Sequence, residues 1–114
     1  MDLHIDKADG VTAVSVKADY LDASNNRDFK DRMVELLPSV QHLLVDLHQV
    51  KFIDSAGLAA LLSCLKQLSA SGGDMKICGA AGAVKATFDL VKMHRIVEVC
   101  KSREEALQAF AKVP

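Results

Sequence analysis

An aspartate and a serine stand side by side in residues 52–58, where an apolar run ends and a leucine-striped segment begins. Asp54 can cap a helix that starts there, because a carboxylate at the N-cap accepts hydrogen bonds from the first free N–H groups. Ser55 is then the first helical residue, and its hydroxyl is not needed for capping. Such a hydroxyl can act as a nucleophile, can carry a phosphate, or can belong to an ordinary cap pair.

Nucleophilic catalysis by Ser55 finds little support in its neighbours. A nucleophilic serine needs a base within hydrogen-bond reach and usually a strained G-x-S-x-G elbow, whereas Ile53 and Asp54 precede this serine. Nothing in the sequence places His48 or His94 beside it. The histidines and cysteines also lack metal-ligand spacing. We therefore expect no enzyme activity and no metal site.

Gly57 is unexpected in the first turn of a helix, where glycine costs up to about 1 kcal/mol relative to alanine. We expect its advantage to be steric, because a residue without a side chain leaves the backbone beside Ser55 open to a partner. Ala56 lies between the two. Ser55 therefore carries the one hydroxyl of the motif.

The elements that position this motif follow from the hydrophobic pattern. Residues 43–47 form an apolar run too short for a helix and broken only by Asp46, which is typical of a strand covered on both faces. Five leucines between Leu58 and Leu68 recur with a helical period and predict a helix with one apolar stripe. Near the N-terminus, Asp9 and Gly10 separate two alternating runs, which predicts a β-hairpin with a type I′ turn.

Strands and helices alternate along the rest of the chain. Ser102 and Glu105 have the spacing of a capping box, which opens a terminal helix. We also expect a helix that follows the N-cap residues of 22–25 and ends before Pro38, a helix through residues 84–91, and strands over residues 75–78 and 96–99.

The element order, β-β-α-β-α-β-α-β-α, predicts a single α/β domain over residues 1–114. Strands that alternate with helices form parallel sheets through right-handed crossovers. We expect a mixed, mostly parallel sheet of four to five strands, with an antiparallel N-terminal edge strand and about four helices. A chain of 114 residues can bury a core without disulfides or a metal.

Charge excludes several classes of function. Fourteen basic and fifteen acidic side chains leave a net charge of −1, so no basic field is available for nucleic acid or an anionic membrane. Residues 1–57 hold six basic and ten acidic side chains (−4), and residues 58–114 hold eight and five (+3). We expect a solvated basic face from Lys85, Lys92, Arg95, Lys101 and Arg103.

Targeting signals are not apparent in the sequence. No apolar run is long enough to cross a bilayer, and the N-terminus is not typical of a signal peptide. Three widely spaced cysteines indicate reduced, buried thiols. We therefore expect a cytoplasmic protein, and we also expect it to be a monomer.

Residues 52–58 resemble the signature of the STAS family, specifically of the bacterial anti-sigma-factor antagonists. The Asp-Ser-x-Gly-Leu piece is the specific part, and similar residues extend over nearly the whole chain. Asp19 departs from the glycine of the family's Gly-x-Leu-Asp corner, and residues 93–95 differ from those usual before the last strand. The similar positions are Leu21, Asp22, Phe52, Ile53, Asp54, Ser55, Ala56, Gly57, Leu58, Gly72, Gly73, Ala83, Val84, Lys85, Phe88, Asp89, Glu105, Ala106 and Leu107.

The resemblance implies partner switching. In that family an anti-sigma factor, itself a serine kinase, phosphorylates the serine at the Ser55 position, and a PP2C-type phosphatase removes the phosphate. The unphosphorylated chain would bind the kinase and free a sigma factor, and phosphorylation would abolish binding. ATP and its Mg²⁺ would belong to the kinase, so the resemblance implies that this chain carries no cofactor of its own. The residues expected at the partner-binding site are Asp22, Asp54, Ala56 and Gly57.

Two other interpretations stay open. A non-switching STAS module would serve as a structural subunit of a transporter or signalling complex, and it would not need a modified serine. A hydrolase with Ser55 as its nucleophile is the third.

Overall fold

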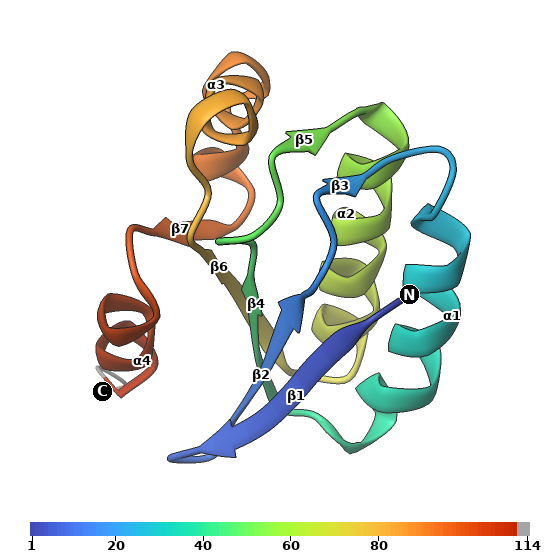
Figure 1. The fold of residues 1–114 in the computed structure, drawn as a ribbon. Coiled ribbons are helices and arrows are strands. Elements are labelled where there is room, and N and C mark those ends of the chain that lie inside the picture. Colours follow the sequence, from blue (N-terminus) through green and yellow to red (C-terminus); the bar gives the residue numbers. More distant parts are fainter. Residues whose placement is uncertain (112–114) are drawn as a thin grey trace.

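The computed structural model describes residues 1–111, which form a five-stranded sheet with helices on both faces (Figure 1). Its strands are β1 (Leu3–Ala8), β2 (Val11–Val16), β4 (His42–Asp46), β6 (Asp74–Cys78) and β7 (Glu98–Cys100). They lie in the order β1-β2-β4-β6-β7. β1 is antiparallel to β2, and the other neighbouring pairs are parallel. The predicted mixed sheet with an antiparallel edge strand is confirmed.

A tight turn joins β1 and β2 at the predicted place. Asp9 and Gly10 have φ angles of +55° and +79°, and a type I′ hairpin requires positive φ at both central residues. Ala8 consequently pairs with Val11, and the register continues to Leu3 opposite Val16.

Within residues 1–111 the chain also forms four α-helices and two 3₁₀ turns. They are α1 (Asn26–Leu36), α2 (Ser55–Ala70), α3 (Gly82–Val91), α4 (Arg103–Ala111), η1 (Leu37–Ser39) and η2 (Met93–Arg95). None of these helices combines the length and apolar character that crossing a membrane requires.

The sheet separates two hydrophobic clusters of different size. The larger cluster joins α1, α2 and α3 to the face that carries Val14, Val45 and Ile77. The smaller cluster joins α4 to the opposite face through Phe110 and Leu44. Because β4 contributes to both clusters, its apolar run is buried on both faces, as predicted.

Two short strands form a separate parallel pair that the sequence pattern did not predict. β3 (Tyr20–Leu21) pairs with β5 (Phe52–Ile53), with Tyr20 opposite Phe52 and Leu21 opposite Ile53. Leu21 and Ile53 are buried, whereas Tyr20 and Phe52 stay exposed. A two-residue strand has no period to detect, so only the tertiary contact reveals it.

The last strand starts two residues later than predicted. The N–H groups of Ile96 and Val97 both donate to the carbonyl of Met93, at 2.9 and 3.1 Å, so they are used in a turn after η2. The Ile96 side chain is 52% exposed. The prediction that Ile96 and Val97 belong to the last strand is wrong, because the turn after η2 takes the hydrogen bonds that a strand would need.

Arg103 does not belong to the solvated face that we expected. Its guanidinium donates to both carboxylate oxygens of Asp6, at 3.0 and 3.2 Å, and to the hydroxyl of Ser15 at 3.3 Å. Its Nε also lies 3.8 Å from Asp46. These contacts tie the start of α4 to β1, β2 and β4.

The buried cysteines lead to a prediction about thiol reactivity. Cys64, Cys78 and Cys100 are free and buried, and burial raises the pKa of Cys64 and Cys78 from 9.0 to about 12. Ellman's reagent should therefore label the native protein far more slowly than the urea-unfolded chain, since the native thiols offer neither thiolate nor access.

The same pKa shifts affect stability at high pH. In the unfolded chain a thiol has a pKa of 9.0 and loses its proton above that pH. In the folded protein Cys64 and Cys78 have a pKa of about 12 and stay protonated up to that range. Stability should therefore fall as the pH rises through this range. Rapid thiol labelling of the native protein would contradict the burial that both predictions rest on.

Candidate functional site

Ser55 is the first residue of α2, and its side chain is exposed. No hydrogen bond involves its hydroxyl among residues 1–111. The start of α2 lies at the same end of the molecule as β3 and β5 (Figure 1). The hydroxyl therefore faces solvent at the edge formed by these elements.

Asp54 caps α2, as the sequence predicts, and also reaches a second segment. Its Oδ1 accepts a hydrogen bond from the N–H of Gly57 at 2.9 Å. Its Oδ2 accepts one from the N–H of Ala23, at 3.1 Å, in the loop between β3 and α1. One carboxylate thus joins the helix that carries Ser55 to a loop far away in sequence.

Asp22 shapes that same loop. Its Oδ1 accepts hydrogen bonds from the N–H and the hydroxyl of Ser24, at 2.9 and 2.6 Å. Its own N–H donates to the side-chain oxygen of Asn25 at 2.9 Å. The structure therefore brings the predicted pair Asp22 and Asp54 to one loop, where both carboxylates hold main-chain groups in place.

Gly57 is buried, which changes the reason for its presence. A Cβ at this position would lie 2.1 Å from the carbonyl oxygen of Leu21 and 2.7 Å from Cγ1 of Ile53. The glycine is needed because α2 packs directly on the backbone of β3. Our expectation that it leaves the backbone open is therefore corrected, while the neighbouring Ala56 is partly exposed.

Tyr20 and Phe52 form an exposed aromatic pair that sequence reasoning missed. They lie opposite each other in the β3–β5 pair and are 46% and 50% exposed. Phe52 stands three residues before Ser55. The sequence did contain a signal for this pair. Each aromatic is followed by another apolar residue, Leu21 or Ile53. Since only one of two adjacent strand residues can face the core, the other must be exposed.

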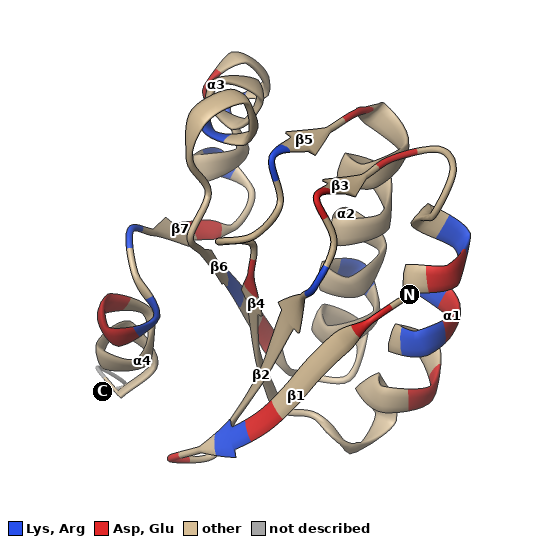
Figure 2. Ribbon diagram, in the orientation of Figure 1, with Lys and Arg blue, Asp and Glu red and all other residues tan. Residues whose placement is uncertain are grey.

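Acidic residues surround this end of the molecule. Figure 2 shows acidic segments at the start of β3, in the loop after it and immediately before α2, with a basic segment beside β5. These are Asp19, Asp22 and Asp54, with Lys51 as the basic neighbour. An anion placed on Ser55 would add to a surface that is already negative.

The two histidines that could serve as bases have other surroundings. Nδ1 of His48 lies 2.9 Å from Oδ1 of Asp46, and His94 lies in η2, where it lines a pocket beside α3. Among residues 1–111 no group of three or more His, Cys, Asp or Glu side chains could hold a metal ion.

Comparisons with known proteins point to one family. The STAS domain model matches residues 2–106. BtrV of Bordetella bronchiseptica, whose assigned name is that of an anti-sigma factor antagonist, is 27% identical over 110 residues, or 96% of this chain and 95% of BtrV. An anti-sigma-factor antagonist (STAS) domain protein from Planctomyces limnophilus has a TM-score of 0.89 at 18% identity, with 98% and 100% coverage. An anti-sigma factor antagonist from Mycobacterium paratuberculosis has a TM-score of 0.85 at 20% identity, with 95% and 92% coverage.

Two further solved structures show the same fold in different settings. Bacillus SpoIIAA in its phosphorylated form has a TM-score of 0.70 at 13% identity and is covered to 99%, against 96% of this chain. The murine anion transporter Slc26a9 has a TM-score of 0.75 at 17% identity, and 90% of this chain matches 18% of the transporter. At these identities the likeness concerns the fold alone.

The contact at Gly57 gives a prediction in which sterics and helix propensity oppose each other. Propensity alone predicts that Gly57→Ala stabilises α2 by about 1 kcal/mol. The new Cβ would instead meet the Leu21 carbonyl at 2.1 Å, so α2 or β3 must move, which we expect to cost about 2–3 kcal/mol. Urea unfolding followed by circular dichroism measures the difference.

A matched control for this variant is Ala59→Gly, at an exposed position of the same helix. It should cost about 1 kcal/mol through propensity alone. If Gly57→Ala were as stable as the parent, α2 would not need to approach β3 so closely.

Proposed function

The chain belongs to the STAS domain family, and we propose that it is an anti-sigma factor antagonist whose partner binding is switched by phosphorylation of Ser55. Unphosphorylated, it binds an anti-sigma factor that is a serine kinase and so frees a sigma factor. A PP2C-type phosphatase restores this state. The observation that carries the proposal is the exposed, unengaged hydroxyl of Ser55 at the start of α2 within the described residues. Relatives named as anti-sigma factor antagonists support the role.

The unmodified surface around Ser55 suits close docking. Tyr20 and Phe52 offer apolar area, and aromatic residues often dominate the energy of an interface. The small residue Ala56 lets a partner approach the hydroxyl. We therefore assign the centre of the docking surface to Ser55, Ala56 and the aromatic pair.

Asp22, Asp54 and Gly57 contribute to binding mainly by holding this surface in shape. Both carboxylates are occupied by hydrogen bonds from the loop or the helix, and Gly57 is buried. The partner would contact only the exposed parts of these residues. Its binding would depend on the loop and helix geometry that they stabilise.

Phosphorylation changes the charge of this surface. A phosphate adds about −1.5 to −2 charges at neutral pH, next to Asp54 and near Asp22. A partner that covers Ser55 would have to strip water from this group, which is costly unless the partner supplies matching cations. A partner shaped for the neutral hydroxyl therefore loses affinity.

The fold itself can accept the phosphate. Both oxygens of Asp54 are already used, so the new anion does not have to replace the cap. The N–H groups of Ser55 and Ala56 have no hydrogen-bond acceptor among residues 1–111, and the positive end of the helix dipole favours a negative group. Binding would thus change while the structure stays intact.

The alternative is a STAS module that serves as a constant structural subunit. The similarity in fold to a part of an anion transporter supports this alternative. Such a module would bind its partner in the same way whether or not Ser55 could be modified. Substitution of this serine separates the two proposals.

Two variants of Ser55 test the switch. Ser55→Ala should keep partner binding and resist inactivation, because it removes the site of phosphate attachment. Ser55→Asp should weaken binding about tenfold or more, because it places a charge in the interface. Its unfolding free energy should stay within about 1 kcal/mol of the parent, since an acidic residue is favourable at a helix N-terminus.

The partner for this test is captured from native cells with Ser55→Ala as bait and identified by mass spectrometry. We expect it to be a protein kinase. Its affinity for purified variants is then measured by calorimetry, and intact-mass analysis follows phosphate transfer from ATP. Ser63→Ala and Ser63→Asp, at an exposed position of the same helix, are matched controls. Equal binding by Ser55→Ala, Ser55→Asp and the parent would favour the constant module.

Phe52 tests the aromatic part of the surface. Phe52→Ser should weaken partner binding about tenfold or more while costing little stability, because the side chain is half exposed. Val34→Ser, at an exposed position of α1 (57%), is the control and should bind like the parent. If both variants bound equally well, the partner would dock elsewhere.

A further inference from the structure

The loops after β6 and β7 leave the sheet in opposite directions. The two strands are parallel neighbours that end side by side, with Cys78 opposite Cys100. After β6 the chain enters α3, which packs with α1 and α2 on one face. After β7 it enters α4, which packs on the other face. Two neighbouring loops that diverge cannot fill the space between them, and ligands of open α/β sheets bind in such crevices.

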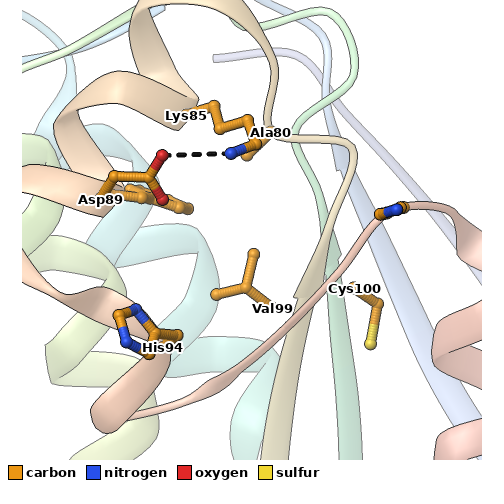
Figure 3. A pocket seen from close by; sticks show the side chains of 8 residues that line it. Ala80, Lys85, Asp89, His94, Val99 and Cys100 are labelled. Carbon is orange, nitrogen blue, oxygen red and sulfur yellow. Dashed lines mark hydrogen bonds and ion pairs between the residues drawn. The ribbon is translucent and has the colours of Figure 1, made fainter.

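A pocket occupies this position. It has a volume of about 230 Å³ and is lined by Ala80 from the loop after β6 and by Lys101 from the loop after β7. Phe88 of α3 and Val99 of β7 add apolar walls. Figure 3 shows Val99 pointing into the space between His94 and the Lys85–Asp89 pair. The volume is below the roughly 300–1,000 Å³ typical of drug-sized ligands, so the pocket has room for only a small group.

The polar groups of the pocket are mostly basic. Lys85, Lys101 and His94 face a single carboxylate, that of Asp89. Lys85 and Asp89 are 3.1 Å apart, but both side chains are about two-thirds exposed (64% and 65%). An ion pair this exposed is weak, so Lys85 can turn towards a ligand at little cost.

A hydrogen bond fixes the backbone of Lys101 at the edge of the pocket. Its N–H donates to Oε2 of Glu105 at 3.3 Å, which fixes the loop at the start of α4. Its ammonium forms no ion pair with any residue in 1–111. Lys101 thus lines the pocket as a cation without an ion pair in this part of the chain, and the walls beside it are apolar.

We propose that this pocket binds a small organic anion, a carboxylate with a compact apolar body. The carboxylate lies towards Lys101 and Lys85, and the apolar body rests against Phe88 and Val99. Ser55 does not line this pocket, and ligand binding there does not depend on phosphorylation. Recognition of a small molecule would be a second function beside the proposed partner binding.

Benzoate is a suitable probe, followed by amide shifts in ¹H–¹⁵N NMR spectra of the full chain. We expect saturable shifts centred on Ala80, Lys85, His94 and Lys101, with a Kd of millimolar order for so small a molecule. Benzamide has the same shape without the charge and should bind about tenfold more weakly, since it forms no ion pairs. Acetate, which lacks the ring, should also bind more weakly.

Variants test whether the ammonium group of Lys101 contributes to benzoate binding. Lys101→Met should weaken benzoate binding about threefold, as expected for loss of one exposed ion pair. Lys66→Met, at an exposed position of α2, should leave it unchanged. Ser55→Ala should bind benzoate like the parent, which separates this site from the proposed switch.

Three results would overturn the proposal. They are an absence of saturable shifts at the pocket, equal binding of benzamide and benzoate, and equal binding of acetate or inorganic phosphate. The first would leave the pocket without a ligand of this class, the second would remove the need for charge, and the third would remove the role of the apolar walls. All three are measured on the parent chain, so they do not depend on the folding of any variant.

Discussion

The Asp54 carboxylate is the contact on which the Ser55 surface depends. It accepts one hydrogen bond from the first turn of α2 and one from the loop after β3, so two segments far apart in sequence are held by one side chain. Gly57 completes the junction, because only a residue without a Cβ lets α2 approach the backbone of Leu21. Ser55 is thus positioned by contacts of its neighbours. Its own hydroxyl remains available for chemistry, which is the condition that a modification site must meet.

The parts of the fold that could be predicted are those with a long period or a local rule. The leucine stripe of α2, the doubly buried β4 and the Asp9–Gly10 turn each follow from neighbours in sequence. The cap by Asp54 follows in the same way, since a cap is a contact over three residues. The family motif then gave Ser55 its significance, which spacing alone could not do.

What could not be predicted depends on contacts between distant segments. β3 and β5 are two residues long and exist because they pair with each other. The role of Gly57 required knowledge of where Leu21 lies, and Arg103 is held by Asp6 at the opposite end of the chain. A sequence pattern reports which faces are apolar, but it does not report which backbone or carboxylate a residue will meet.

The uneven charge of the chain gives the Ser55 surface and the pocket beside α3 opposite charges. The Ser55 region lies in the acidic half, with Asp19, Asp22 and Asp54 around it, whereas the pocket beside α3 lies in the basic half. A small anion would be repelled from the first and attracted to the second, and a phosphate on Ser55 would widen this difference. α3, which lines the pocket, packs against β5, which leads directly into Asp54, so the two surfaces lie on neighbouring elements while carrying opposite charges. Each can therefore be occupied without competing for the ligand of the other.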